Sequence, residues 1–204
     1  MAQLNFHQNV IIFTDSIFKY IEPPYGATLS IKRGATTRTL TRLIRERSFR
    51  TYHSLTQFDL AIIHVGTNDI DNYFKRNHAR NRRLASESSV AIEIFNDFMQ
   101  LILEIKSQNR NIKIIISGIL PRPKTFSFST SLTIAVNNKL RVLASQRGYL
   151  HFHASYKTFM HHSIPIPELF AMDREHISRL GTVRATLMLK NLVALYEQRR
   201  LSFH

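Results

Sequence analysis

Five short apolar runs, separated by helical patterns, constrain the fold of this 204-residue chain most strongly. The runs are rich in β-branched residues and are bounded by polar residues, which predicts strands that are buried on both faces. They cover residues 9–13, 26–31, 59–65, 112–117 and 149–153. Because strands that alternate with helices form βαβ units, we expect an α/β fold with a five-stranded parallel sheet and helices on both faces.

The segments between the apolar runs predict helices and loops. The expected helices are a short one that opens near Ser16 and longer ones at 36–49, 86–106, 131–146 and 178–199. Residues 75–83 are basic and poorly periodic, which predicts a loop. Residues 154–172 predict a long irregular stretch, and such stretches in compact domains are usually functional. The length and the lack of repeats or linkers predict one domain over 1–204.

The composition excludes several classes of protein. With 44% hydrophobic and 21% charged residues, the chain is expected to be soluble and globular. No apolar run is long enough to span a bilayer. There is no cysteine, which excludes disulfides, thiolate zinc sites and a cysteine nucleophile. The start of the chain has no signal-peptide pattern, so we expect an intracellular location, cytoplasmic or nuclear.

The net charge of +14 favours attraction to polyanions, which makes nucleic acid or an anionic membrane surface a candidate partner. The alternative is a solvated basic surface with no dedicated partner. Aromatic residues do not alternate with the basic ones, so any binding is expected to be non-specific and salt-sensitive. The residues expected to contribute are Arg38, Arg42 and Arg45 in the helix at 36–49, and Arg80, Arg82 and Arg83 at the loop after Asp69. That loop is expected to lie close to the carboxyl edge of the sheet, where it could select an anionic substrate.

Four polar segments follow strands or precede the last helix. They are Thr14-Asp15-Ser16, Gly34, Gly66-Thr67-Asn68-Asp69 and Asp173-Arg174-Glu175-His176. In a parallel sheet the carboxyl ends of the strands lie on one edge, so all four segments are expected to converge there.

The chemistry of these segments is complementary. Ser16 supplies a hydroxyl at a helix N-terminus, where a developing negative charge is favoured. His176 is suited to take the hydroxyl proton, and Asp173 is suited to orient the imidazole. Asn68 offers a side-chain donor to an oxyanion. Each part alone has a plainer interpretation: Asp15 or Ser16 as a helix cap, Asn68-Asp69 as a turn, and His176 as an ordinary surface or capping histidine like the other nine.

Together these segments resemble the sequence blocks of the SGNH (GDSL-type) hydrolases. The family's Gly-Asp-Ser block is matched by Thr14-Asp15-Ser16 and its lone glycine by Gly34. Its Gly-x-Asn-Asp block is matched by 66–69, and its Asp-x-x-His block by 173–176. The resemblance implies a flavodoxin-like, three-layer α/β/α sandwich.

The resemblance also implies the roles of individual residues. Ser16 is the nucleophile, His176 the base and Asp173 its orienting partner. The oxyanion donors are the backbone N–H of Ser16, the backbone N–H of Gly34 and the side chain of Asn68. No metal or cofactor is expected. The substrate is a small ester, with short acyl groups such as acetyl among those that the family cleaves.

Thr14 departs from the family pattern, which usually has glycine there. A β-branched residue does not readily adopt positive φ, so this turn must have a conformation that is open to threonine. A narrower resemblance, to esterase domains of non-LTR retrotransposons and related mobile or viral elements, depends on three features. These are Thr-Asp-Ser, the segment at 117–122, and the basic surface.

Three functions fit this sequence. The first is a serine esterase that transfers an acyl group to Ser16 and then to water. The second is an SGNH-like scaffold that binds nucleic acid or anionic lipid, with weak or lost catalysis. The third is an acyltransferase that uses the same triad. The complete set of triad and oxyanion residues favours an enzyme, whereas the net charge of +14 weakly favours the binding module.

Overall fold

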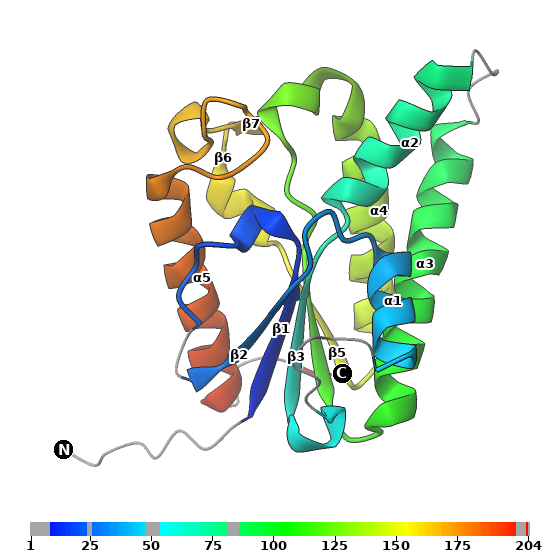
Figure 1. Ribbon diagram of the computed structural model, residues 1–204, viewed down its shortest axis with the longest axis vertical. Coiled ribbons are helices and arrows are strands. Elements are labelled where there is room, and N and C mark those ends of the chain that lie inside the picture. The colour runs from blue at the N-terminus through cyan, green and yellow to red at the C-terminus, as the bar shows by residue number, and fades with distance from the viewer. Residues whose placement is uncertain (1–8, 24–25, 48–53, 81–85, 199–202, 204) are drawn as a thin grey trace.

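The computed structural model describes residues 9–23, 26–47, 54–80, 86–198 and 203. A five-stranded sheet forms its centre (Figure 1), and its strands are β1 (Val10–Thr14), β2 (Thr28–Ile31), β3 (Leu60–His64), β4 (Lys113–Ser117) and β5 (Leu150–His153). All neighbouring pairs are parallel, in the order β2-β1-β3-β4-β5. The five expected strands and the predicted α/β fold are therefore confirmed.

Helices cover the sheet unequally on its two faces (Figure 1). The helices α1 (Thr37–Arg45), α3 (Glu87–Gln108) and α4 (Phe126–Ser145) pack on one face. The helix α5 (Arg179–Glu197) packs on the other face, beside the 3₁₀ turn η1 (Ser16–Phe18). Successive side chains of β1 point to opposite faces of the sheet. Ile11 and Phe13 pack in the core beneath α1, α3 and α4, while Val10 and Ile12 pack in the core beneath α5.

Two expectations about loops are corrected by the structure. The helix α2 spans Thr67–Arg80, so a loop at 75–83 is wrong for residues 75–80, and residues 81–83 lie outside the described residues. Ile70, Tyr73 and Phe74 pack against the core and hold the start of α2. Once a helix is nucleated, extending it costs little, which explains why the basic segment continues it.

The stretch at 154–172 is also more ordered than expected. It contains η5 (Ser155–Phe159), a small hairpin of β6 (Met160–His161) and β7 (Ile164–Pro165), and η6 (Pro167–Leu169).

The helix α4 begins five residues before the expected start at 131. The hydroxyls of Ser129 and Thr133 donate to carbonyls four residues earlier, which satisfies these polar side chains inside the helix.

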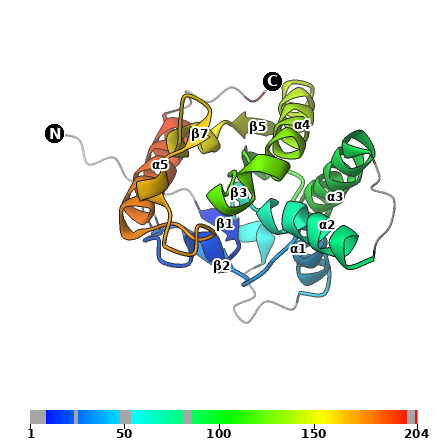
Figure 2. The same ribbon diagram turned by 90° about the horizontal axis from the view of Figure 1, so that it is seen from above.

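The strand order places a topological switch point between β1 and β3. The chain moves from β1 outward to β2 and then returns to β3 on the other side of β1. Open parallel sheets bind ligands at the carboxyl ends of the strands at such a point. Seen from above this edge, η1 and the N-terminal end of α2 lie over β1 and β3 (Figure 2). The structure therefore puts the segments after β1 and β3 where a site is expected.

Candidate functional site

Ser16 lies immediately beyond the carboxyl end of β1. Thr14 ends the strand in extended conformation and is fully buried, so the threonine occupies a position that does not need positive φ. Asp15 caps η1, because its Oδ1 accepts a hydrogen bond of 2.8 Å from the backbone N–H of Ile17. The capping interpretation of Asp15 is thus correct. It leaves Ser16 as the first residue of the turn, with its side chain half-buried.

Asp173 and His176 share a tight turn before α5. Asp173 Oδ1 accepts from the backbone N–H groups of Glu175 and His176, at 2.9 and 3.0 Å. Its Oδ2 lies 2.7 Å from Nδ1 of His176. These bonds, above all the one from the His176 backbone, hold the pKa of Asp173 well below its usual range. The carboxylate therefore stays ionised and orients the imidazole ring.

The imidazole of His176 reaches the hydroxyl of Ser16. Its Nε2 lies 3.4 Å from Ser16 Oγ, although 160 residues separate the two in the sequence. Catalytic hydrogen bonds of this kind are often long before substrate binds. The arrangement can pass a proton from Ser16 to His176 while Asp173 fixes the ring, as nucleophilic catalysis requires.

Asn68 connects three segments at the same edge of the sheet. It lies in the first turn of α2, and its Nδ2 donates to Asp15 Oδ2 at 2.8 Å and to the backbone oxygen of Ala35 at 3.0 Å. An amide nitrogen has two hydrogens, so both are used in this structure. For Asn68 to donate to an oxyanion, one of these acceptors must give up or share its hydrogen.

Gly34 is placed near the site through this contact. It precedes Ala35 in the exposed turn after β2, which is closed by a bond from Ala35 N–H to Lys32 O. Its φ of +67° is in the left-handed region. The oxyanion roles of Gly34, Asn68 and the Ser16 N–H remain predictions.

Arg122, which was not among the residues predicted for the site, approaches from the loop after β4. It is buried and forms an ion pair with Asp71 of α2. Its Nη2 is also 3.4 Å from Asn68 Oδ1. Burial raises the pKa of Asp15, while the Ile17 N–H and the Arg122 charge oppose this rise. The only signals for Arg122 were its position after a strand and the prolines on both sides of it.

A buried histidine also lies beneath the site. His64 ends β3, and its ring stacks on Phe18 of η1 with 3.9 Å between centroids. Its Nδ1 is 2.7 Å from Ser117 Oγ, which bonds in turn to Ser155. Burial lowers the pKa of His64 to about 3, so the ring is neutral. The expectation that nine histidines are surface or capping residues is wrong here, because a histidine on a central strand faces the packed layer.

Asp69 joins α2 to the start of α1. Its carboxylate is buried and accepts from the hydroxyl of Thr37 at 2.6 Å and from the Thr37 backbone N–H at 3.2 Å. Burial raises its pKa to about 7 despite these bonds. The hydrogen bonds between Asp69 and Thr37 thus fix α2 and α1 relative to each other beside the site.

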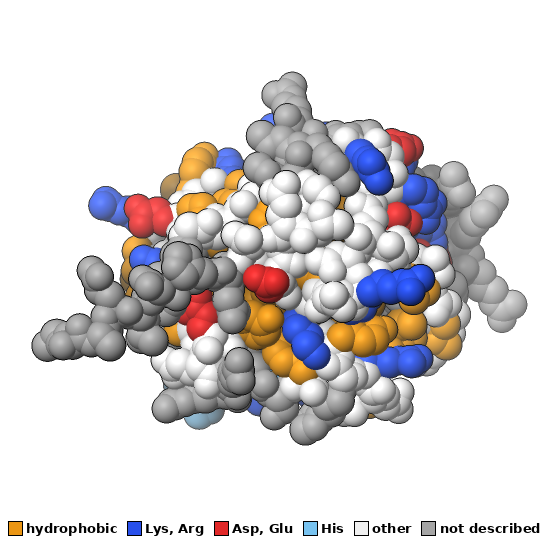
Figure 3. Space-filling model, turned by 90° about the horizontal axis from the view of Figure 1, so that it is seen from below, with side chains coloured by type: hydrophobic (Ala, Val, Ile, Leu, Met, Phe, Trp, Pro, Cys, Tyr) orange, Lys and Arg blue, Asp and Glu red, His pale blue; other side chains and the backbone are white. Residues whose placement is uncertain are grey.

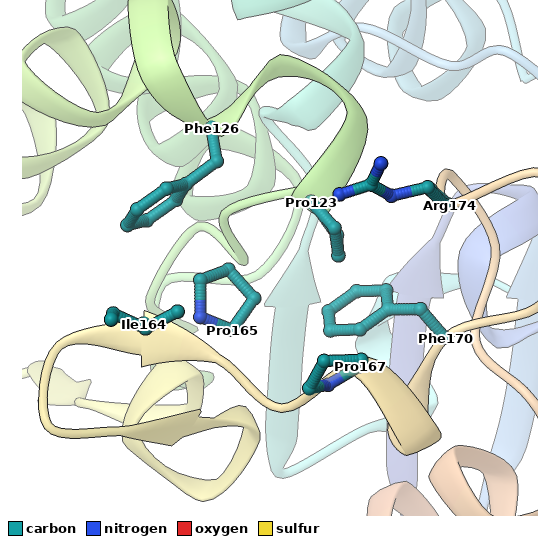
Figure 4. Close-up of a pocket in the computed structure, with 7 residues that line it drawn as sticks. All are labelled: Pro123, Phe126, Ile164, Pro165, Pro167, Phe170 and Arg174. Carbon is teal, nitrogen blue, oxygen red and sulfur yellow. The ribbon is translucent and has the colours of Figure 1, made fainter.

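A small apolar cavity of about 150 Å³ lies beside the Asp173–His176 turn (Figure 4). Phe126, Pro165 and Phe170 form its walls, and Arg174 lies at one side. Phe170 pairs with Ile177, the residue after His176, which ties this wall to the turn. An apolar cavity of this volume can accept a group about the size of benzene.

The structure pairs two of the expected polyanion-binding residues with acids. Arg38 forms ion pairs with Glu93 and Asp97 of α3, and Arg45 does so with Glu104. Arg42 is exposed, whereas the side chains of Arg80, Arg82 and Arg83 lie outside the described residues. On the end of the molecule opposite the site, basic side chains form separate groups among apolar and acidic ones (Figure 3).

The expected position of Arg80 changes as well. Arg80 is twelve residues beyond Asn68 in one helix, roughly 18 Å along its axis. The C-terminal end of α2, which carries Arg80, therefore points away from the carboxyl edge (Figure 1), so Arg80 does not lie close to that edge.

Metal-binding clusters and membrane-spanning helices are both absent from the described residues. No group of three or more His, Asp and Glu side chains is arranged there to hold a metal ion. In the same part of the chain, no helix has the length and hydropathy needed to cross a membrane.

Comparison with solved structures identifies the fold. A Streptococcus pneumonia protein provisionally described as a platelet activating factor superimposes with a TM-score of 0.68 and 18% identity, over 91% of this chain and 84% of that one. A GDSL-like lipase from Bacteroides thetaiotaomicron gives 0.65 and 15%, over 93% and 89%. The catalytic domain of a peptidoglycan O-acetyltransferase from Streptococcus pneumoniae gives 0.60 and 15%, over 95% and 96%.

The chain thus has the α/β fold seen in GDSL-type hydrolases. The sequence matches no protein-family model and no curated protein. None of the three structures bears on the narrower resemblance to mobile-element esterase domains, which stays a prediction.

Proposed function

We propose that the chain is a serine esterase that hydrolyses short-chain, acetyl-type esters. The observation that carries this proposal is the continuous relay from Ser16 Oγ to His176 Nε2, at 3.4 Å, and from His176 Nδ1 to Asp173, at 2.7 Å. The relay sits at the switch point of a fold that is shared with lipolytic proteins. Fold alone does not define activity, so the proposal rests on the geometry of these three side chains.

The relay defines the steps of the reaction. Ser16 Oγ attacks the ester carbonyl as its proton moves to His176 Nε2, and the carbonyl oxygen becomes an oxyanion. When the tetrahedral intermediate collapses, the alcohol leaves with the proton from His176 and the acyl group remains on Ser16. Water then attacks this acyl-enzyme while His176 takes a proton from it. Collapse releases the acid and returns the proton to Ser16.

The oxyanion is to be stabilised by the backbone N–H groups of Ser16 and Gly34 and by the amide of Asn68. Asn68 must redirect one hydrogen from Asp15 or Ala35 toward the substrate. A developing negative charge is a stronger acceptor than the neutral Ala35 carbonyl, so the second bond is the one expected to be exchanged.

The small apolar cavity beside Arg174 is suited to bind the acyl group of the substrate if that group is short. Its volume of about 150 Å³ suits a few carbons, and its walls offer Phe126, Pro165 and Phe170. Chromogenic esters of acetate, butyrate, hexanoate and octanoate test this, with Ser16→Ala as the control. We expect kcat/KM to fall beyond hexanoate. Turnover by Ser16→Ala equal to that of the parent would exclude the proposal.

Acyl transfer to an acceptor other than water is the second candidate, because the fold is also that of an O-acetyltransferase domain. The same relay would activate an acceptor hydroxyl in place of water. Product analysis with an added sugar alcohol distinguishes the two: a transferase forms the new ester faster than free acid, and an esterase forms acid.

The scaffold that binds polyanions is a third candidate, supported by the net charge of +14. Substituting Arg80, Arg82 and Arg83 with Ala should weaken polyanion binding while leaving hydrolysis of a neutral ester unchanged. The matched triple substitution of Arg38, Arg42 and Arg45 should weaken binding less, because Arg38 and Arg45 already pair with acids. Absence of polyanion binding at low salt would exclude this candidate.

A further inference from the structure

A second and larger cavity lies between α4 and the segment that follows β5. Its volume is about 540 Å³, within the range of small-molecule sites. One wall comes from α4, and the other comes from η5, β6 and the turn after it. None of its described lining residues belongs to the Ser16–His176 site. The β6–β7 hairpin separates the two cavities, because Met160 lines the larger one and Pro165 the smaller one.

The guanidinium of Arg141 is held in this cavity by neutral groups. It donates to the hydroxyl of Tyr156 at 3.1 Å and to Oδ1 of Asn138 at 3.3 Å. Its Cζ lies 5.4 Å from the ring centroid of Phe152. No ion pair within the described part of the chain involves Arg141. The group is therefore oriented in advance, and its charge has no counter-ion there.

Two other polar side chains of the cavity, Asn137 and Thr133, are already hydrogen-bonded within the protein. The side-chain amide of Asn137 accepts a hydrogen bond from the backbone N–H of Ile119 and donates one to the backbone oxygen of Ile119. The hydroxyl of Thr133 donates to the carbonyl of Ser129 within α4. Lys157 adds a second positive charge, and there is no acid among the described residues that line the cavity. The two positive charges therefore favour a ligand that carries acceptors and a negative charge.

The remaining wall is apolar. Pro121, Ile134 and Met160 line it, and Ile134 is 53% exposed although it is a large aliphatic side chain on a helix. An apolar ligand group that covered Ile134 would remove this surface from water.

We propose that this cavity binds a small organic anion, a carboxylate or a phosphate monoester attached to an apolar group of about one aromatic ring. The acidic group pairs with Arg141, whose planar fork matches the oxygens of either anion, and with Lys157. The apolar group packs on Ile134 and Met160. This site is independent of the proposed esterase reaction.

The test is calorimetric titration of the full chain with benzoate, phenyl phosphate and neutral benzyl alcohol at low ionic strength. We expect one or both anions to bind and benzyl alcohol to bind far more weakly. Arg141→Gln should weaken anion binding by about tenfold or more, the loss expected for a charge-assisted hydrogen bond. Arg147→Gln is the matched control, because it removes the same charge just after α4 but outside the cavity.

Each outcome of the titration either supports or overturns the proposed anion site. A preference for benzoate or for phenyl phosphate identifies the acidic group and supports the proposal. Equal weakening by Arg147→Gln would show only a general charge effect and overturn it. So would equal binding of benzyl alcohol, or no binding of either anion. If Arg141→Gln does not fold, Ile134→Glu replaces it, since it places a carboxylate at an exposed helix position in the cavity and should abolish anion binding.

Discussion

The carboxylate of Asp15 accepts a hydrogen bond of 2.8 Å from the side-chain amide of Asn68. The residue before the proposed nucleophile is thereby joined to the proposed oxyanion donor, across 53 positions of sequence. The second amide hydrogen reaches Ala35, beside Gly34. One short side chain thus holds together the segments that follow β1, β2 and β3.

Asn68→Ala tests the oxyanion role of this side chain. Removal of one such donor lowers kcat by roughly 10²–10³ in other hydrolases, and we expect the same range with little change in KM. Steady-state kinetics on a short neutral ester gives both values. A raised KM with unchanged kcat would instead make Asn68 a residue that binds the ground state.

Asp173→Asn tests the orientation of His176. The pKa of Asp173 is held so low that its carboxylate is charged throughout an assay and can accept the hydrogen bond from His176. An amide cannot accept from Nδ1–H in the same way, and we expect kcat to fall by roughly 10⁴ with the fold intact. Circular dichroism serves as the control. A loss of folding in this variant would make Asp173 structural.

Asp69 should make stability depend on pH. Its pKa is raised to about 7 by burial, so the folded chain holds this proton more tightly than the unfolded chain, where the value is near 4. The contribution is fully present below pH of about 4 and is lost as the pH rises through about 7. In urea unfolding, the free energy of unfolding of Asp69→Asn should therefore fall less far below that of the parent at pH 8 than at pH 5. The expected change in this difference is a few kcal/mol, at roughly 1.4 kcal/mol per pKa unit.

His64 acts in the opposite direction in the same experiment. Burial lowers its pKa to about 3, so its contribution is present above the unfolded-state value near 6.5 and is lost as pH falls through about 3. Because His64 is present in both proteins, it cancels in the difference between Asp69→Asn and the parent. A difference that does not change with pH would contradict the burial of an ionisable Asp69.

Gly66→Ala should destabilise the turn between β3 and α2. Gly66 has a φ of +114°, and an added Cβ would lie 2.8 Å from Ile119 Cδ1 and 3.1 Å from Phe98 Cζ. Backbone strain and overpacking together predict a loss of roughly 2–5 kcal/mol in the free energy of unfolding. Gly34→Ala is the matched control, since its φ is +67° but its Cβ would meet open space. A loss in Gly66→Ala no larger than that of the control would show that the packing around Ile119 yields.

The sequence predicted the strands and the arrangement of Ser16, Asp173 and His176 because these depend on local signals. Apolar runs mark the strands, and parallel strands bring their carboxyl ends to one edge. Arg122 and Asp71 had no such signal, since their pairing depends on how the loop after β4 crosses α2. The same holds for Arg38 and Arg45, whose acidic partners lie on a helix more than fifty residues away. The basic face of α1 is therefore less available than its sequence indicated.

Labelling with a fluorophosphonate probe tests the central claim, that Ser16 is an activated nucleophile. Its hydroxyl lies 3.4 Å from His176 Nε2, so the probe should phosphonylate Ser16, and peptide mass spectrometry should locate the adduct there. Ser16→Ala should lose both the label and esterase activity above the residual level that oxyanion donors and binding provide. His176→Ala should lose most of the labelling rate. Labelling at another serine, or equal turnover by Ser16→Ala and the parent, would contradict the account.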